Sequence, residues 1–126
     1  MRFIETKSAP SAIGPYSQAV EVQGVLYCSG QIPIVPETGE LILDDMKRAT
    51  EQVLKNISAI LAEAGLTKKN IVKTTVFLAD MNSFSILNTA YETFFEDHKP
   101  ARAAVEVSCL PKNVQVEIEG IAVLEK

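Results

Sequence analysis

Residues 70–97 read NIVKTTVFLADMNSFSILNTAYETFFED, and they predict a β-strand followed by an amphipathic α-helix. The segment 70–79 is rich in Val, Ile, Thr and Phe, which favour strands. From about residue 83 to residue 97, apolar side chains recur at helical spacing, with Asn82 or Ser83 as the expected N-cap. The stripe consists of Phe84, Leu87, Tyr91 and Phe94.

A second helix is expected over about residues 45–64, before this strand. Its apolar positions again recur every three or four residues: Met46, Ala49, Val53, Ile57, Ile60, Leu61 and Ala64. Asp44 or Asp45 can cap its start, and Gly65 suits a left-handed stop. Further upstream, residues 17–30 place valines and a tyrosine on either side of Gln23-Gly24, which indicates a β-hairpin.

Two alternating segments follow the second helix, over residues 103–109 and 114–124, and the turn between them predicts another hairpin. The order is therefore β-hairpin, helix, strand, helix, β-hairpin. This order favours an α+β fold in which both helices pack on one face of a mixed sheet.

The other face of that sheet is expected to remain uncovered. Segment 70–79 is apolar on both sides, with Val72, Val76 and Leu78 against Ile71, Phe77 and Ala79. The end of the last segment repeats this pattern. Large uncovered apolar faces usually mark interfaces, so the pattern predicts a homo-oligomer.

Length and composition limit the function classes. The 126 residues suit one domain, 1–126. Net charge −4 and three scattered arginines fit poorly with a nucleic-acid partner, because phosphate binding needs clustered cations. No apolar run could cross a bilayer, and no signal peptide is apparent, so we expect a cytoplasmic protein.

The sequence also offers few residues for a metal site or a reactive thiol. The only histidine is His98, and the two cysteines, Cys28 and Cys109, are far apart in the sequence. Structural and catalytic zinc sites normally need three or four Cys, His or carboxylate ligands, so we expect no metal site. Nothing adjacent to Cys28 supplies a base, and capping a helix end is the simpler role for His98.

Among the remaining residues, Arg102 is a candidate for binding a carboxylate because its guanidinium forms a planar fork. Surface salt bridges are the commoner use of arginine. Glu117 and Glu119 lie on one side of the last predicted strand, where burial could convert one of them into a general acid or base. A solvated strand face is the alternative.

Four polar residues near loops or a helix could orient a ligand or a water molecule: Tyr16, Ser17, Ser29 and Asn88. Turn capping, partial burial and simple surface exposure are their alternative roles.

Four ordered motifs resemble the Rid family of reactive-intermediate deaminases, also called the YjgF or endoribonuclease L-PSP family. They are AIGPYSQA (12–19), SGQIP (29–33), VKTTVFLADM (72–81) and PARAAVEV (100–107), the last followed by LPK (110–112) and VEIE (116–119). The resemblance covers essentially the whole chain. It implies a chorismate-mutase-like fold of the bacillus type, assembled as a homotrimer with ligand sites between subunits and needing no metal or organic cofactor.

The resemblance also implies an activity, namely hydrolysis of 2-aminoacrylate and 2-iminobutanoate to 2-oxo acids and ammonia. It makes Arg102 the clamp for the substrate carboxylate. Glu117 would orient the attacking water and handle its proton, with Tyr16 beside it. Ser29, Gly30, Asn88 and Ala104 would line the pocket.

Two positions depart from the family pattern: Ala104 stands where cysteine is frequent, and Cys109 where arginine often precedes Leu-Pro. Two other functions use the same motifs, a non-catalytic module that binds 2-oxo acids and an RNA-cleaving translation inhibitor. If residues 103–124 form a hairpin, Glu106 lies near Glu117 and Arg102 is about 13 Å further along. That separation favours a site shared between subunits.

Overall fold

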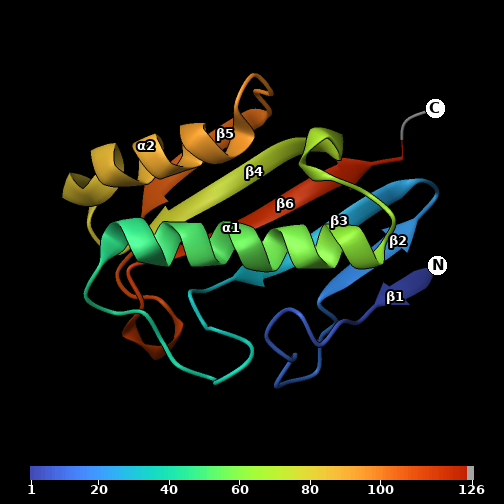
Figure 1. Cartoon of the computed structure of the whole chain (residues 1–126), viewed down its shortest axis with the longest axis horizontal. Coiled ribbons are helices and arrows are strands. Elements are labelled where there is room, and N and C mark those ends of the chain that lie inside the picture. The colour runs from blue at the N-terminus through green and yellow to red at the C-terminus, as the bar shows by residue number, and fades with distance from the viewer. Residues whose placement is uncertain (125–126) are drawn as a thin grey trace.

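The computed structural model describes residues 1–124, which form one six-stranded mixed sheet with two helices on one face (Figure 1). The strand order is β1-β2-β3-β6-β4-β5. The strands are β1 (Arg2–Ile4), β2 (Ala19–Val22), β3 (Val25–Gln31), β4 (Ile71–Leu78), β5 (Ala101–Glu106) and β6 (Val116–Val123). The helices are α1 (Met46–Glu63) and α2 (Phe84–Phe95), with 3-10 turns η1 (Lys68–Asn70), η2 (Met81–Ser83) and η3 (Pro111–Asn113). This confirms the α+β prediction.

Helix α1 forms where its apolar stripe and caps predict. The Asp45 side chain accepts a hydrogen bond from the Arg48 backbone N–H at 3.0 Å, which satisfies a donor of the first turn. Gly65 follows the helix with φ +79°, a conformation that glycine adopts without strain. The stripe covers the sheet: Met46 and Ala64 at its ends are 7% exposed, and the residues between them, including Val53 and Ile57, are at most 1% exposed.

The first hairpin is confirmed as strands β2 and β3, joined through Gln23 and Gly24. Both residues have positive φ, 51° and 78°, which matches the right-handed twist of the strands. Helix α2 is also confirmed, although Ser83 occupies its N-cap position without a side-chain hydrogen bond. Asp80 instead accepts a hydrogen bond from the Asn82 N–H and caps the preceding turn η2.

The second predicted hairpin is wrong. Strand β5 pairs in parallel with β4, and β6 lies antiparallel between β3 and β4. Because α2 carries the chain back along one face of the sheet, β5 runs in the same direction as β4, as in a βαβ unit. Strand β5 also begins at Ala101 and ends at Glu106, earlier than the alternation over residues 103–109 indicated.

The two faces of the sheet differ strongly. Val76, Val116 and Ile118 are fully buried, facing the helices. On the opposite face, register places Phe3, Tyr27 and Ile121 in one cross-strand row, and Phe3 is 67% and Tyr27 50% exposed. No helix within residues 1–124 covers that row (Figure 1).

A register shift between Ile71 and Lys73 corrects one detail of the predicted strand. Ile71 is buried at 1% and Val72 is 44% exposed, so the two residues exchange the sides expected from strict alternation. The prediction that this strand is apolar on both sides holds for Val76 and Phe77. Among the described residues, no helix is long and apolar enough to span a membrane.

Candidate functional site

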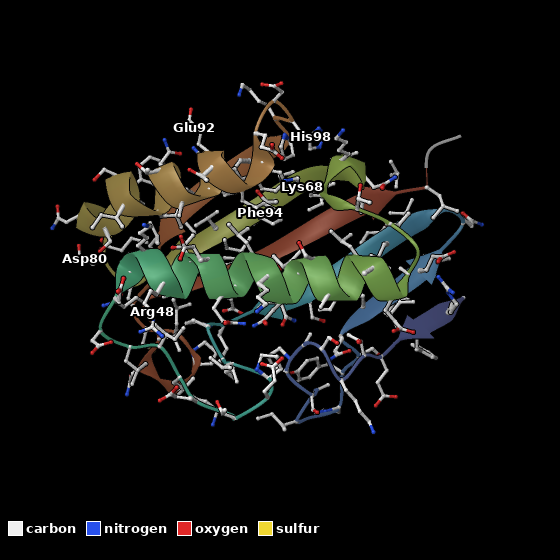
Figure 2. The ribbon with its side chains drawn as sticks, viewed as in Figure 1. Arg48, Lys68, Asp80, Glu92, Phe94 and His98 are labelled. Atoms are coloured by element: carbon white, nitrogen blue, oxygen red, sulfur yellow. The ribbon has the colours of Figure 1, made fainter. Side chains whose placement is uncertain are left out.

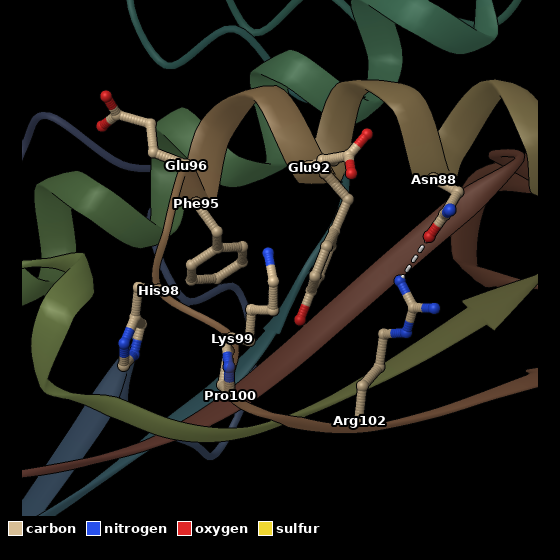
Figure 3. Close-up of a pocket in the computed structure, with 9 residues that line it drawn as sticks. Asn88, Glu92, Phe95, Glu96, His98, Lys99, Pro100 and Arg102 are labelled. Carbon is tan, nitrogen blue, oxygen red and sulfur yellow. Dashed lines mark hydrogen bonds between the residues drawn. The ribbon is translucent and has the colours of Figure 1, made fainter.

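Arg102 lies on β5 and points toward α2 on the helix-covered face of the sheet. Its Nη1 donates a hydrogen bond to Asn88 Oδ1 at 2.8 Å (Figure 3). The guanidinium carbon also lies 4.8 Å from the centre of the Tyr91 ring and 5.2 Å from that of Phe84. These contacts fix the plane and direction of the guanidinium.

Tyr91 is itself held in place from below. Its hydroxyl lies 2.7 Å from the Thr74 hydroxyl in a buried hydrogen bond, and Thr74 is the β4 residue paired with Arg102. Burial raises the pKa of the Tyr91 phenol, outweighing the effects of this bond and of the Arg102 charge. The ring therefore stays neutral and presents its face to the cation.

The guanidinium is available to an anion. Within residues 1–124, Arg102 forms no salt bridge, and its bond to Asn88 uses one of five N–H groups. It opens onto a cavity of about 390 Å³ between α2 and the start of β5. An arginine braced by two rings and an amide, with no carboxylate partner, is well suited to bind a carboxylate.

Glu117 lies on β6 and points away from the helices. Its neighbours Val116 and Ile118 are fully buried on the helix side, so alternation directs Glu117 to the other face. Burial, and then the charge of Glu119, raise the pKa of the Glu117 carboxyl above its ordinary value. A carboxylate shifted in this direction is better matched to acid–base work near neutral pH.

Gly30 makes room for Glu117. A Cβ placed on Gly30 would lie 2.9 Å from Glu117 Cδ and nearer still to the carboxylate oxygen, so any larger residue must displace the carboxylate. Tyr16, Gly30 and Glu117 line one cavity of about 170 Å³, together with the loop residue Lys112. The structure thus brings together three of the predicted site residues.

The other predicted site residues have simpler positions. The Ser29 hydroxyl donates to the Ser17 carbonyl at 2.6 Å and ties the bulged end of β3 to the preceding loop. Asn88 contacts Arg102. Ala104 lies two residues after Arg102 on the same side of β5 and packs, partly buried, against the core.

Arg102 and Glu117 do not meet within one protomer. They lie on opposite faces, on strands separated by β4, and three residues apart in register. At about 4.8 Å per strand and 3.3 Å per residue, the Cα atoms of Arg102 and Glu117 are roughly 14 Å apart. The predicted proximity of Glu106 and Glu117 is also wrong, since Glu106 pairs with Leu78 and accepts a hydrogen bond from the Met81 N–H at 2.7 Å.

Cysteine and histidine have structural positions. Burial raises the pKa of the Cys28 thiol to about 12, and the charge of Glu119 adds to the effect, so a thiolate nucleophile is disfavoured. His98 Nε2 lies 2.7 Å from the Ile71 carbonyl and links the end of α2 to β4. Among residues 1–124, no three Cys, His, Asp or Glu side chains gather as a metal site.

Sequence reasoning missed two residues that contact Arg102, Phe84 and Tyr91, and a third, Thr74, that holds Tyr91 in place. Phe84 and Tyr91 were identified only as part of an apolar stripe, and Thr74 only as a strand former. A signal was present, because Phe84, Asn88 and Tyr91 follow one another at spacings of four and three on α2, which places them on one helix face.

Comparisons with known proteins match almost the whole chain. Residues 6–124 match the family model described as Endoribonuclease L-PSP. A RutC family protein of Pyrococcus abyssi is 52% identical over 122 residues, covering 97% of this chain and 96% of the relative. The 2-iminobutanoate/2-iminopropanoate deaminase of Mus musculus is 49% identical over 122 residues, covering 97% and 90%. The crystal structure of Escherichia coli TdcF with bound serine is 44% identical, with a TM-score of 0.95 and coverage of 99% and 100%.

Proposed function

The chain belongs to the endoribonuclease L-PSP family, and from this membership we propose that it is a 2-iminobutanoate/2-iminopropanoate deaminase. Its substrates would be the imine forms of 2-aminocrotonate and 2-aminoacrylate, released by dehydratases that depend on pyridoxal phosphate. The observation that carries the proposal is Arg102, braced by Asn88, Phe84 and Tyr91 and without a salt-bridge partner in residues 1–124. Each substrate carries a carboxylate that this guanidinium can bind. The mouse relative bearing the deaminase name supports the activity.

We further propose that the protein acts as a homotrimer with its sites between subunits. The uncovered face of the sheet exposes Phe3, Tyr27 and Val105, which a second copy would bury. One protomer separates Arg102 from Glu117, so a small substrate can reach both only if Glu117 comes from a neighbouring copy. Assembly would therefore complete the site.

The chemistry follows from these two groups. Arg102 binds the carboxylate and fixes the adjacent imine carbon, which is electrophilic and more so when its nitrogen is protonated. Glu117 accepts a proton from a water molecule as the water oxygen bonds to that carbon, and Tyr16 borders the same cavity. The carbinolamine then gives its hydroxyl proton to nitrogen, the C–N bond breaks with its electrons on nitrogen, and ammonia leaves.

Glu117 has a raised pKa, which suits acceptance of a proton from the attacking water. Acid–base assistance of this kind accelerates a reaction by about 10²–10⁴-fold. Imines of this class hydrolyse readily even in water, so such a contribution suffices.

A second candidate function is a non-catalytic module that binds 2-oxo acids. One observation favours it: the arginine half of the site is complete within one protomer and needs no contact with Glu117. A Glu117→Gln variant separates the two functions, because a binding module keeps both binding and biological function, whereas a hydrolase keeps binding and loses turnover.

The direct test combines the purified protein with a threonine or serine dehydratase and semicarbazide, which traps the imine. Wild type should suppress semicarbazone formation, and Arg102→Ala should not. Arg48→Ala is the matched control, since Arg48 is an exposed arginine on α1. Unchanged trapping with wild type would reject the deaminase proposal for these substrates and leave the binding module as the leading candidate.

A further inference from the structure

The cavity in front of Arg102 is larger than the smallest proposed substrates need. It measures about 390 Å³ and extends from Asn88 and Arg102 past Tyr91 and Phe95 to Lys99. A three-carbon imino acid held on Arg102 would leave most of it unfilled.

A second cation faces this space. Figure 3 shows the Lys99 side chain running toward α2, as the Arg102 side chain does. Within the described residues, neither side chain forms a salt bridge. The cavity therefore has two basic groups that no carboxylate of residues 1–124 neutralises by direct contact.

Two glutamates also border the cavity, yet they do not neutralise these cations. The Glu96 carboxylate accepts a hydrogen bond from Lys68 Nζ at 2.7 Å, and the same ammonium donates to the Phe94 carbonyl at 2.6 Å. Figure 2 labels Lys68 and Phe94, which lie close together. In Figure 3 the carboxylates of Glu92 and Glu96 point away from Lys99 and Arg102. Within residues 1–124, neither glutamate therefore forms an ion pair with Lys99 or Arg102.

Both cations can reach one ligand, because Lys99 and Arg102 line the same cavity. Lysine carries its ammonium on a flexible four-carbon stem, so Lys99 can approach the free end of a ligand whose first carboxylate is held by Arg102. A four- or five-carbon diacid separates its carboxyl carbons by only about 4–5 Å, which a cavity of about 390 Å³ accommodates.

We propose that Lys99 binds a second carboxylate of the ligand, so that this site takes 2-imino dicarboxylates of four or five carbons. The inference rests on the proposed function for its reaction. The imine of such an acid and one water give the 2-oxo diacid and ammonia, with no other co-reactant. Eliminating water from serine or threonine cannot form such imines. The supplying reaction would be a two-electron oxidation at the α-carbon of an acidic amino acid, or elimination of water from the 3-hydroxy derivative of one.

The test measures equilibrium binding of two stable product acids, 2-oxobutanoate and 2-oxoglutarate, by titration calorimetry. Wild type should bind 2-oxoglutarate about two- to fivefold more tightly, the range for one partly exposed ion pair, and the preference should shrink with added salt. Lys99→Met should abolish the preference, and Lys99→Glu should reverse it. Lys55→Met, which removes an exposed lysine on α1, is the matched control and should keep it.

Equal affinity of wild type for the two acids, or an unchanged preference in Lys99→Met, would overturn the inference. Suppression of semicarbazone formation by wild type, combined with no diacid preference, rejects the Lys99 subsite and leaves the deaminase standing. A diacid preference without hydrolysis of any imine rejects the deaminase and leaves a diacid-binding site. Failure of wild type to bind either acid rejects the subsite together with the clamp role of Arg102.

Discussion

Replacing Arg102 with lysine keeps the positive charge and removes the planar fork. Lysine can form only one of the two parallel hydrogen bonds to a carboxylate, and a charge-assisted bond is worth about 1.5–3 kcal/mol. It also loses the flat stacking on Tyr91 and Phe84, 4.8 and 5.2 Å away, which contributes about 0.5–1 kcal/mol at a partly exposed site. The sum is about 2–4 kcal/mol, or a loss of about 30- to 900-fold in kcat/KM at 1.36 kcal/mol per tenfold.

The loss should fall mainly on KM. The carboxylate carries the same charge in the ground state and in the transition state, so the clamp contributes uniform binding. The coupled dehydratase assay gives kcat/KM, and calorimetry gives the matching rise in Kd for 2-oxobutanoate. Arg48→Lys serves as the control and should match wild type. An Arg102→Lys variant within threefold of wild type, or one that loses kcat at constant KM, would refute the clamp.

Three further changes probe the surroundings of the two charged groups. Gly30→Ala should displace the Glu117 carboxylate and lower kcat by about 10²-fold, while binding of 2-oxobutanoate by calorimetry stays within twofold. Glu119→Gln removes a charge that raises the pKa of Glu117, so the acid limb of the pH–rate profile should move to lower pH; a shift to higher pH would contradict this assignment. Tyr91→Phe leaves the buried Thr74 hydroxyl without its hydrogen-bond partner, so it should lower the free energy of unfolding by about 1–3 kcal/mol in urea titration. It should keep kcat/KM within threefold, because the face of the ring that contacts Arg102 remains.

The regular elements could be predicted because their signals are local. The stripe of α1, the Asp45 cap and the Gln23-Gly24 turn each lie within a few residues of the structure they specify. The pairing of β5 could not be found in the same way. Alternation of apolar and polar residues shows that a segment is a strand, but it does not show which other strand it pairs with. Adjacent strands joined by a short turn commonly pair, and here β6 instead inserts between β3 and β4.

The candidate site was predictable to a similar degree. Motif resemblance placed Arg102, Asn88, Gly30 and Glu117, and the structure puts Arg102 beside Asn88 and Gly30 beside Glu117. The residues alone left Arg102, Asn88 and Glu117 each with an alternative role at the surface. No local sequence pattern tells which face of the sheet a side chain points to. That depends on the order in which the strands pair. The wrong hairpin therefore produced a wrong register between Arg102 and Glu117.

Placement of Arg102 and Glu117 on opposite faces makes the proposed assembly testable by complementation. Arg102→Ala and Glu117→Gln should each be inactive alone. In mixed oligomers made by coexpression, a site between subunits is intact wherever an unmodified Arg102 meets an unmodified Glu117 of its neighbour. With random mixing, about one interface in four satisfies this condition, so about a quarter of wild-type activity should return. If each protomer held a complete site, no mixture could restore activity, and the division of the site between copies would be rejected.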